Sequence, residues 1–574
     1  MFRLILLLFF GYTFAATADQ WRGRSIYQVI TDRYALPAGA DVNACNITAQ
    51  TWCGGTWRTI TDNLDYIQDA GFTAIWISPV NQNYQGPSTA YGDPYHGYWI
   101  ADASQLNLRF GTSDDLKALS AELHRRGMYL MVDIVANNVM ATSITPDWSV
   151  YMFKDPVNSC CFSDPKCLMP CSFKTQYHPY CPIDWNNLTS VQNCWLGDTS
   201  VSLPDLNTQD PTVASIYGSW ISNLVQEYAI DGLRIDAAKH VQAPFWTPFC
   251  ESAGVFCMGE VFGSDIALAS SYQQVMDSVL NYPLYDAIVQ GFSIPGPGNL
   301  SNVSAVMGQI QNSFKDPTLL GNFLENQDVP RWHSISVDPQ SLFNAMILTF
   351  MSDGIPIIYY GQEQGLDGSG DPYNRGPLWT TGYQRTAAYN LTATLNRLRN
   401  YLVNNTNWAQ SRTQVLRVSS QGIAIMKGDV VTIMTNIGSP VRTGRMNWIC
   451  SSLMVWCLQP QNASMFAYTH WPSSFSSTDI FSCKQWAVGS GGTVEVQYTK
   501  GGTAVILVPD DILQGSGLCL ASSQGKSSTA SLSNGGVWRV NVPSVISVSL
   551  VSLFLNFLGV MKQGIPSLYY LPEA

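Results

Sequence analysis

Short apolar runs alternate with longer amphipathic stretches between about residues 20 and 400. The runs are rich in Val, Ile and aromatic residues, as is typical of strands that are buried on both faces. Between them, apolar positions recur with a helical period, as in 113–126 and 213–228. This alternation predicts a parallel sheet, and its length favours a closed (β/α)8 TIM barrel over residues 19–400. The expected strands are Ser25–Val29, Thr73–Ile77, Tyr129–Val135, Gly232–Ile235, Gly254–Met258, Leu319–Leu324 and Ile355–Tyr360.

A long segment, about 138–205, interrupts the alternation after the third expected strand and holds six cysteines. We expect a disulfide-linked insertion domain here, because irregular loops of this length are uncommon in compact folds. From about 410 to 520 the pattern changes to short β-rich runs such as 422–426 and 430–436. This change predicts a separate C-terminal domain, an all-β sandwich.

The N-terminus has the pattern of a secretory signal peptide. A charged start at Arg3 precedes an apolar run over 4–14 and the cleavage motif Ala16-Thr17-Ala18. The run is too short to span a bilayer. We therefore expect residues 1–18 to be removed as the chain enters the secretory pathway.

The C-terminus carries a second apolar stretch. Residues 521–541 form a linker that is rich in Ser, Gly and Thr, and residues 542–560 contain no charged side chain. The apolar stretch is either a removable GPI-attachment signal, with small residues near 533–535 as the attachment site, or a membrane anchor. Residues 561–574 continue past the point where such signals normally end, and a buried core helix is a third alternative. The first two alternatives predict a location at the cell surface or cell wall.

The composition indicates a globular protein and argues against a polyanionic partner. Hydrophobic residues make up 46 % of the chain and charged residues 12 %, which excludes a disordered chain. The net charge of −11 excludes nucleic acid as the expected partner. A neutral polymer fits better, since the 18 Trp and 27 Tyr offer aromatic faces, although such rings can also fill the core. We expect a monomer.

Twelve of the 14 cysteines lie in short-range pairs or clusters, which in an exported chain indicates disulfide bonds. A zinc cluster at 160–171 is the alternative, but no histidine is interleaved there. N-x-S/T sequons also suit a eukaryotic secretory route. The cysteine groups are Cys45/Cys53, Cys160/Cys161/Cys167/Cys171, Cys181/Cys194, Cys250/Cys257 and Cys450/Cys457. The sequons begin at Asn46, Asn187, Asn299, Asn302, Asn390, Asn404 and Asn462.

Three carboxylates each follow an apolar run: Asp236 ends DGLRID, Glu260 ends GVFCMGE and Asp328 ends FLENQD. Barrel enzymes carry their chemistry at the carboxyl ends of strands, so we expect the three side chains at one rim. Two carboxyl groups about 5–5.5 Å apart support double displacement through a covalent glycosyl-enzyme. Arg234 should face the same side as Asp236 and keep it ionised. Acidic rims are common in barrels, so this constellation is not specific by itself.

The sequence motifs around these carboxylates are more specific for one type of enzyme. They read DIVANN at 133–138, GLRIDAAKH at 232–240, GEVFG at 259–263 and FLENQD at 323–328. In these words the chain resembles the fungal α-amylases of glycoside hydrolase family 13, over residues 20–440. Flanking words that match are CGGTW from Cys53, AYGDPYHGYW from Ala90, CWLGD from Cys194, LPDL from Leu203 and GIPIIYYGQE from Gly354.

The resemblance implies a retaining enzyme that acts on α-1,4-glucan. It implies that Asp236 is the nucleophile, Glu260 the acid/base and Asp328 the stabiliser of the transition state. Side chains from several barrel loops would contact the sugar, chiefly in the subsite that bears the scissile bond. The expected substrate-binding residues are His96, Tyr98, Trp99, Arg234, Lys239, Asp371 and Arg375, together with Asn138 and Gln327.

The resemblance also implies a structural Ca2+ that ties the insertion to the barrel. The matching positions are Asn137, Gln192, Asp205 and His240. A carboxylate, an amide and carbonyl oxygens suit this hard cation, so Gln192 and His240 should contribute backbone carbonyls. The alternatives are a turn residue for Asn137 and a helix cap for Asp205.

Asn138 and Gln327 are departures from the family pattern. The first block usually ends in His and here ends in Asn138, and the fourth usually reads ENHD and here reads ENQD. An amide donates a hydrogen bond but cannot carry the charge of an imidazolium, and loss of one well-aimed donor can lower a rate by about 10²–10³. The same pair of changes is similar to that of the GPI-anchored fungal α-amylase homologues, which act as 4-α-glucanotransferases and are associated with cell-wall α-glucan.

Three functions follow from these observations. The first is a cell-surface 4-α-glucanotransferase that acts on maltooligosaccharides or starch-like glucan, with weak hydrolysis. The second is a secreted α-amylase that hydrolyses the same bonds and is weakened by the two substitutions. The third is an inactive glucan-binding surface protein, against which the three carboxylates argue.

Overall fold

The structure is a computed structural model that describes residues 16–146, 176–296, 298–439, 463–498 and 502–519. Several expectations fall outside these residues. They are the apolar run of the signal peptide, the cysteines at 160–171, 450 and 457, the sequon at Asn462, the linker and the C-terminal apolar stretch. Within the described residues, no helix has both the length and the apolar character needed to cross a membrane.

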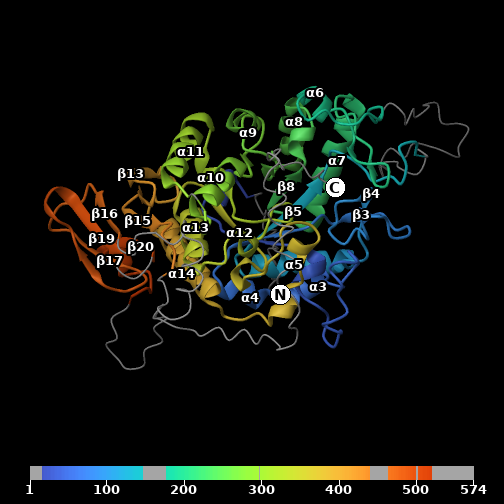
Figure 1. Cartoon of the computed structure of the whole chain (residues 1–574). Helices are drawn as coiled ribbons and strands as arrows, with labels where there is room; N and C mark the ends of the chain where they lie inside the picture. Colours follow the sequence, from blue (N-terminus) through green and yellow to red (C-terminus); the bar gives the residue numbers. More distant parts are fainter. Residues whose placement is uncertain (1–15, 147–175, 297, 440–462, 499–501, 520–574) are drawn as a thin grey trace, which may run out of the picture.

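A closed parallel sheet forms the centre of the larger domain (Figure 1). Its strands are β1 (Ile26–Val29), β2 (Ala74–Ile77), β5 (Tyr129–Val135), β8 (Gly232–Asp236), β9 (Phe256–Gly259), β10 (Ser278–Val279), β11 (Gly321–Asn322) and β12 (Ile355–Tyr359). They are ordered β10-β9-β8-β5-β2-β1-β12-β11. A parallel bridge between Leu280 and Gly321 joins the two ends of the sheet. The predicted eight-stranded barrel is therefore confirmed.

The interior of the barrel changes from apolar to polar along the strands. Alternate residues of a strand face the same side, so residues two apart share the interior. The polar layer near the carboxyl ends contains Gln28, Asp133 and Arg234, all of them buried. This layer underlies the rim on which the three carboxylates were expected. The apolar layer below it includes Ile26, Ala74, Met131, Phe256, Met258 and Ile357.

Helices surround the barrel, and the two predicted in detail are confirmed to within two residues at each end. The helix over 113–125 begins at a capping box formed by Thr112 and Asp115, and the helix over 211–228 is capped by Asp210. The helices are α1 (Ala18–Arg22), α2 (Thr31–Tyr34), α3 (Trp57–Asp62), α4 (Leu64–Asp69), α5 (Ser113–Arg125), α7 (Pro211–Tyr228), α8 (Trp246–Ala253), α9 (Ile266–Tyr272), α10 (Tyr282–Phe292), α11 (Leu300–Ser313), α12 (Trp332–Ile335), α13 (Pro339–Met351) and α14 (Ala387–Asn405). Single 3-10 turns are η3 (Ala238–His240), η4 (Ala243–Phe245), η5 (Pro317–Leu319), η6 (Gln362–Gln364), η7 (Tyr373–Arg375), η8 (Leu378–Thr381) and η9 (Ser490–Gly492).

The insertion follows β5, the third barrel strand along the chain, as predicted. Its described part contains α6 (Leu188–Val191), β6 (Leu196–Gly197) and β7 (Ser202–Leu203). An antiparallel bridge from Asn138 to Asp205 returns it to the end of β5. The disulfide Cys181–Cys194 cross-links it. The expected pairs Cys45–Cys53 and Cys250–Cys257 are also bonded. A second excursion, after β2, forms the hairpin of β3 (Asn81–Asn83) and β4 (Ile100–Leu106).

Several strand predictions need correction. The strand expected from Gly254 begins at Phe256, because Gly254 ends α8 with a left-handed backbone at φ 66°. The strand expected over 319–324 is confined to β11, because Leu319 belongs to the preceding 3-10 turn η5. Strand β10 was not predicted, since two residues carry no period. The pair Cys483–Cys519 was also missed, because 36 residues separate the two cysteines.

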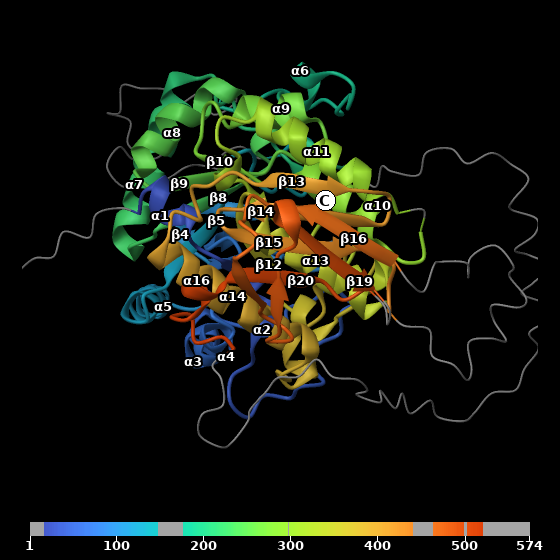
Figure 2. The same ribbon diagram turned by 90° about the vertical axis from the view of Figure 1, so that its left-hand side faces the viewer.

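The C-terminal domain consists of two antiparallel sheets with an apolar core between them. The larger sheet has the order β13-β14-β15-β20-β17-β18, and Figure 2 shows its central strands facing the viewer. Strands β16 and β19 form the second sheet, which confirms the predicted sandwich. The elements are β13 (Gln414–Val418), β14 (Gly422–Lys427), β15 (Val430–Thr435), β16 (Ala463–Tyr468), β17 (Ser476–Asp479), β18 (Gln485–Ala487), β19 (Thr493–Tyr498), β20 (Val505–Pro509) and the short helix α16 (Asp510–Leu513).

Buried polar contacts join this domain to the barrel. Lys427 Nζ on β14 lies 2.7 Å from Asp353 Oδ1, and the two side chains are 3 % and 7 % exposed. The hydroxyl and backbone N–H of Thr413 also donate to Asp353. On α13, Asn344 accepts the N–H of Thr435 and donates to the Gly502 carbonyl. These buried contacts thus hold the C-terminal domain firmly against the outside of the barrel.

Candidate active site

Arg234 lies at the centre of the polar layer and contacts three carboxylates. Its Nη1 is 2.8 Å from Asp236 Oδ1 and 2.9 Å from Asp133 Oδ1. Its Nη2 is 2.7 Å from Glu260 Oε2. Strands β5, β8 and β9 are neighbours in the barrel, so acidic residues near their carboxyl ends meet at one guanidinium. The structure thus brings Asp236 and Glu260 together at the rim.

The two oxygens of Glu260 have different partners. Oε2 contacts Arg234 Nη2 and accepts the backbone N–H of Ala237 at 3.1 Å. Oε1 accepts the hydroxyl of Tyr282 at 3.0 Å, and that hydroxyl in turn accepts from Asn326 Nδ2. Oε2 thus faces a guanidinium and a backbone N–H, whereas Oε1 faces a neutral hydroxyl. Donors of the protein therefore hold both oxygens of Glu260 in place.

Burial sets the charge balance of this cluster. Burial raises the pKa of Asp236 well above its usual value; Arg234 lowers it, and Glu260 and Asp133 raise it. Burial also raises the pKa of Asp133 to about 6, against the effect of Arg234. For Arg234 itself burial lowers the pKa, but the neighbouring carboxylates outweigh it and the pKa stands well above the usual value. Arg234 therefore stays charged, and the ionisation of Asp236 depends on it.

Asp328 follows β11 and faces the loop after β12. Its Oδ1 lies 3.4 Å from Arg375 Nη2, and its side chain is 28 % exposed, so a substrate can reach it. Arg375 Nη1 lies 3.2 Å from Asp371 Oδ2, and the Tyr95 hydroxyl donates to Asp371 Oδ1 at 3.3 Å. The structure thus joins Asp328, Asp371 and Arg375 in one group at the rim.

His96 and Tyr98 form a stacked pair beside the carboxylates. Their ring centroids are 5.6 Å apart, and the Tyr98 hydroxyl donates to Asp133 Oδ2 at 2.8 Å. Burial and the nearby Arg375 lower the pKa of His96 well below its usual value, so its imidazole is neutral. Trp99 is only 2 % exposed and packs edge-on against His96 at 4.9 Å. The structure therefore places Trp99 behind His96, away from any open surface.

The two departures from the family pattern lie in different surroundings. Gln327 is buried; its Nε2 donates to the Tyr98 hydroxyl at 3.0 Å, and its Oε1 accepts from Gln28 Nε2 at 2.6 Å. Asn138 is also buried, and its Oδ1 lies 3.2 Å from a terminal atom of the Asn137 amide. Gln327 thus belongs to the hydrogen-bond network of the carboxylates, and Asn138 lies where the barrel meets the insertion.

Lys239 lies on the other side of Glu260, between two aromatic rings. Its Nζ donates to the Phe262 carbonyl at 3.0 Å and lies 5.2 Å from the centroid of the Phe262 ring. The Trp185 ring of the insertion is 5.9 Å from Nζ and 39 % exposed. This corner therefore offers a cation and an accessible aromatic face next to Glu260.

Three of the expected calcium ligands come together where the insertion meets the barrel. One terminal atom of the Asn137 amide lies 3.1 Å from both Asp205 Oδ1 and the His240 carbonyl oxygen. With oxygen in that position, three oxygens converge, as a hard cation requires; with nitrogen there, the amide donates to both. The Gln192 carbonyl accepts from Gln242 Nε2 at 2.9 Å. No cluster of three or more His, Cys, Asp or Glu side chains within the described residues could hold a metal ion, so a site here relies on amide and carbonyl oxygens beside the single carboxylate of Asp205.

Some residues of the site were not predicted from the sequence. Tyr282 contacts Glu260, Trp76 Nε1 donates to Asp133 Oδ2 at 3.1 Å, and Gln28 contacts Gln327. For these residues, the sequence offers a signal only at Gln28. Gln28 is a polar residue inside the apolar run IYQVI, at a position that should face the barrel interior.

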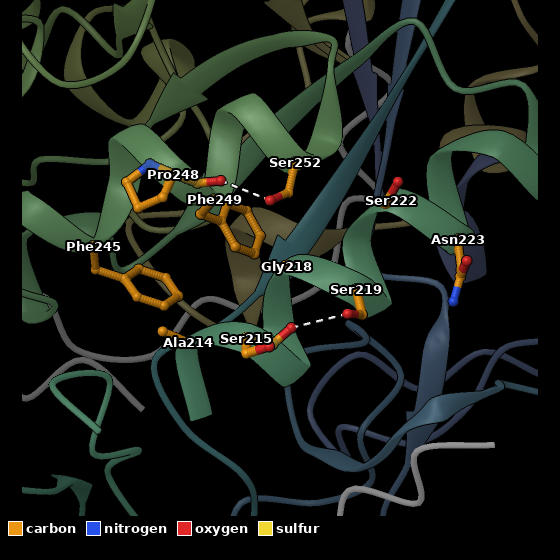
Figure 3. Close-up of a pocket in the computed structure, with 10 residues that line it drawn as sticks. All are labelled: Ala214, Ser215, Gly218, Ser219, Ser222, Asn223, Phe245, Pro248, Phe249 and Ser252. Carbon is orange, nitrogen blue, oxygen red and sulfur yellow. Dashed lines mark hydrogen bonds between the residues drawn. The ribbon is translucent and has the colours of Figure 1, made fainter. Parts of the chain in front are cut away.

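A cavity of about 600 Å³ lies elsewhere, between α7 and α8 on the outside of the barrel (Figure 3). Serine side chains and two phenylalanines line it. Ser219 Oγ donates to the Ser215 carbonyl and Ser252 Oγ to the Pro248 carbonyl. These hydroxyls are thus used within their own helices, and the lining includes none of the residues expected in the active site.

Comparisons with known proteins agree with this geometry. A family model described as "Alpha amylase, catalytic domain" matches residues 23–383, and one described as "Alpha-amylase, domain C" matches residues 453–527. Alpha-amylase 1 of Lipomyces kononenkoae is 49 % identical over 391 residues, which cover 67 % of this chain and 60 % of that longer protein. Alpha-amylase 1 of Schwanniomyces occidentalis is 38 % identical over 88 % of this chain and 93 % of its own. The solved structure of an α-amylase from Malbranchea cinnamomea superposes with a TM-score of 0.79 at 38 % identity, over 88 % of this chain and 100 % of that one.

Proposed function

The chain belongs to the α-amylase family, and on that premise we propose that it is a 4-α-glucanotransferase with weak hydrolytic activity. Members of this family are glycosidases that act on α-glucan. The proposed substrates are maltooligosaccharides and starch-like α-1,4-glucan. Asp236, Glu260 and Asp328 are the proposed catalytic residues.

In the first step, the Asp236 carboxylate attacks the anomeric carbon and the glycosidic C–O bond breaks. Glu260 gives its proton to the departing oxygen. The arrangement supports these roles, because Arg234 lies 2.8 Å from Asp236 and favours its charged form, and Oε1 of Glu260 contacts a neutral hydroxyl rather than a cation. Asp328, held by Arg375, would stabilise the positive charge that develops on the sugar.

In the second step, a hydroxyl group of an acceptor glucan attacks the same carbon and the bond to Asp236 breaks. Glu260 takes the proton of that hydroxyl. Water in place of the acceptor gives hydrolysis, so the outcome depends on how well the acceptor is held. Lys239 and the accessible Trp185 ring lie beside Glu260 and are the proposed acceptor contacts.

The observation that carries the choice of transfer is the environment of Gln327. Its amide oxygen is bound by Gln28 and its nitrogen contacts Tyr98, so it acts as a neutral donor. It cannot take up the charge that an imidazole at this position can carry. The second candidate is a hydrolytic α-amylase, which is favoured by the names of the two relatives described above.

Product analysis with maltopentaose separates the two candidates. Transfer gives products longer than maltopentaose without a matching gain of reducing ends. Hydrolysis gives one new reducing end for each bond that is broken. If reducing ends account for every cleavage and no longer product forms, the transferase proposal is wrong. The Asp236→Asn variant supplies the background.

We further propose that Ca2+ binds between the insertion and the barrel. Asn137 and Asp205 would hold it with side-chain oxygens, and His240 and Gln192 with backbone carbonyls. The convergence on the Asn137 amide supports this donor set. A bound ion would neutralise the buried carboxylate of Asp205 and tie the two segments together.

The proposed location is the cell surface. The pattern of a signal peptide over residues 1–18 and the apolar stretch over 542–560 motivate this proposal. The four disulfides within the described part of the chain are typical of an exported protein. We propose a GPI-anchored monomer, with the barrel at 19–400 and the β domain at 410–520 facing the cell wall.

A further inference from the structure

Gln28 is a buried polar residue in the barrel interior that none of the steps above uses. It lies on β1, is 3 % exposed, and is level with Trp76 on β2 and Tyr359 on β12. A buried amide is unfavourable unless it is hydrogen-bonded. Its nitrogen donates to Gln327 Oε1 at 2.6 Å, and within the described residues this side-chain hydrogen bond is the one that links Gln28 to the rim of the active site.

The hydrogen bonds between Gln28 and the carboxylate cluster run in a single direction. As a carboxylate, Asp133 can only accept, so Tyr98 donates its one hydrogen to it. Tyr98 can then only accept from Gln327, which must turn its NH2 group toward the tyrosine. The oxygen of Gln327 therefore faces Gln28, which must donate. Each side chain fixes the orientation of the next.

We propose that Gln28 is a positioning residue that holds the Gln327 amide with its nitrogen toward Tyr98 and the reacting sugar. The inference rests on the proposed function only in placing the sugar beside Gln327. The amide nitrogen has two hydrogens, of which Tyr98 receives one, and the other donates to a sugar hydroxyl. Without Gln28 the Gln327 oxygen loses its donor, so Tyr98 alone holds the amide and the direction of its nitrogen is less well fixed. The donor is then less well aimed at the sugar hydroxyl.

The amide oxygen of Gln28 indicates that this residue does not serve the stability of the fold. Its Oε1 is buried and has no hydrogen-bond partner within the described part of the chain. An unpaired buried acceptor lowers stability, and an apolar side chain of the same length would avoid that loss. The amide at position 28 is thus explained by what its nitrogen does for Gln327.

The first test is the variant Gln28→Met, which keeps the length of the side chain and removes the donor. With maltopentaose we expect kcat for total bond cleavage to fall about tenfold, with KM changed less than twofold, since the contact acts in the transition state. The Tm should equal or exceed that of the wild type. Ile26→Val, on the same strand and the same barrel face, should keep the wild-type kcat. If Gln28→Met does not fold, Gln28→Asn keeps the amide but ends one methylene short of Gln327.

The second test repeats Gln28→Met in a Gln327→Leu background. If Gln28 acts through Gln327, it has no further effect on kcat there, because the two effects are not additive. An equal fold loss in both backgrounds, or an unchanged kcat in the Gln28 variants, would overturn the proposal. Total cleavage counts transfer and hydrolysis alike, so the test can be read even if the enzyme only hydrolyses.

Discussion

Arg234 Nη1 lies 2.8 Å from Asp236 Oδ1, so the proposed nucleophile is paired with a cation two residues earlier on the same strand. Residues two apart on a strand face the same side, and no loop has to order for the pair to form. The pairing opposes the rise that burial causes in the pKa of Asp236. It therefore extends to lower pH the range in which the nucleophile is charged.

Replacing Arg234 should shift this range. In Arg234→Lys, an ammonium group cannot contact Asp133, Asp236 and Glu260 at once, so the pKa of Asp236 rises further. Asp236 must be ionised to attack, so the acidic limb of the kcat/KM profile should move to higher pH, by about one pH unit. Arg125→Lys, on the exposed end of α5, is the control and should leave the profile unchanged. A variant profile that overlies the wild type would exclude this role.

Asp236→Asn should abolish both transfer and hydrolysis. An amide cannot form the glycosyl ester, and the change keeps the volume of the side chain. Activity on maltopentaose is the measurement, with near-wild-type melting as evidence of folding. Asp429→Asn, in the exposed turn between β14 and β15, should keep full activity. More than a few per cent of residual activity in a folded Asp236→Asn protein would mean that another residue is the nucleophile.

Much of the fold could be predicted from local patterns. Strands β1, β2, β5, β8 and β12 are apolar runs, and their predicted ends agree with the structure to within one residue. Strand β10 could not be predicted, because it has only two residues. It is defined by its parallel pairing with β9, which exists only in the folded sheet. The pair Cys483–Cys519 could not be predicted either, since its two halves meet only when the C-terminal domain folds.

The candidate site was predictable only where its residues are contiguous. Arg234 and Asp236 share one strand, and Glu260 directly follows the next strand along the chain, so their meeting follows from the barrel. Gln28 and Gln327 are 299 residues apart and meet only because β1 lies close to β11 in the closed sheet. Trp99 shows the opposite case, because its neighbour Tyr98 contacts the carboxylates and its own ring packs in an apolar cluster with Met140 and Leu203.

Removal of calcium should lower the melting temperature. An ion that binds only the folded state stabilises it by mass action, here through Asn137 and Asp205. Melting curves with excess EDTA and with added CaCl2 are the measurement. In Asn137→Ala the two curves should coincide, because the variant lacks one of the oxygens that would bind Ca2+. Identical wild-type curves after exhaustive chelation would argue against the site.

The C-terminal apolar stretch should hold the protein at the cell surface. Residues 542–560 lie outside the described structure, so this prediction comes from the sequence alone. A phosphatidylinositol-specific phospholipase should release the full-length protein from intact cells, and a chain ending near residue 530 should appear in the medium. Full-length protein that is free in the medium with its tail intact would contradict the anchor.

The double change Asn138→His and Gln327→His should raise the ratio of hydrolysis to transfer with maltopentaose. Imidazoles at these positions can carry charge while water attacks the glycosyl-enzyme. If both side chains contact the same sugar, the double variant should exceed the sum of the two single changes. The single variants are the matched controls. A folded double variant with the wild-type ratio would mean that acceptor contacts near Lys239 decide the outcome.

The ion pair of Lys427 and Asp353 limits how this enzyme can be divided or recombined. A hybrid whose β domain covers Asp353 but lacks Lys427 would leave this carboxylate buried without its cation, at a cost of about 3–5 kcal/mol. That loss is a large share of the stability of a typical domain. The barrel should therefore not fold stably when it is fused to a β domain from another protein that lacks this contact. It should be inherited together with its β domain, and hybrids should succeed only when both halves of this contact come from the same parent.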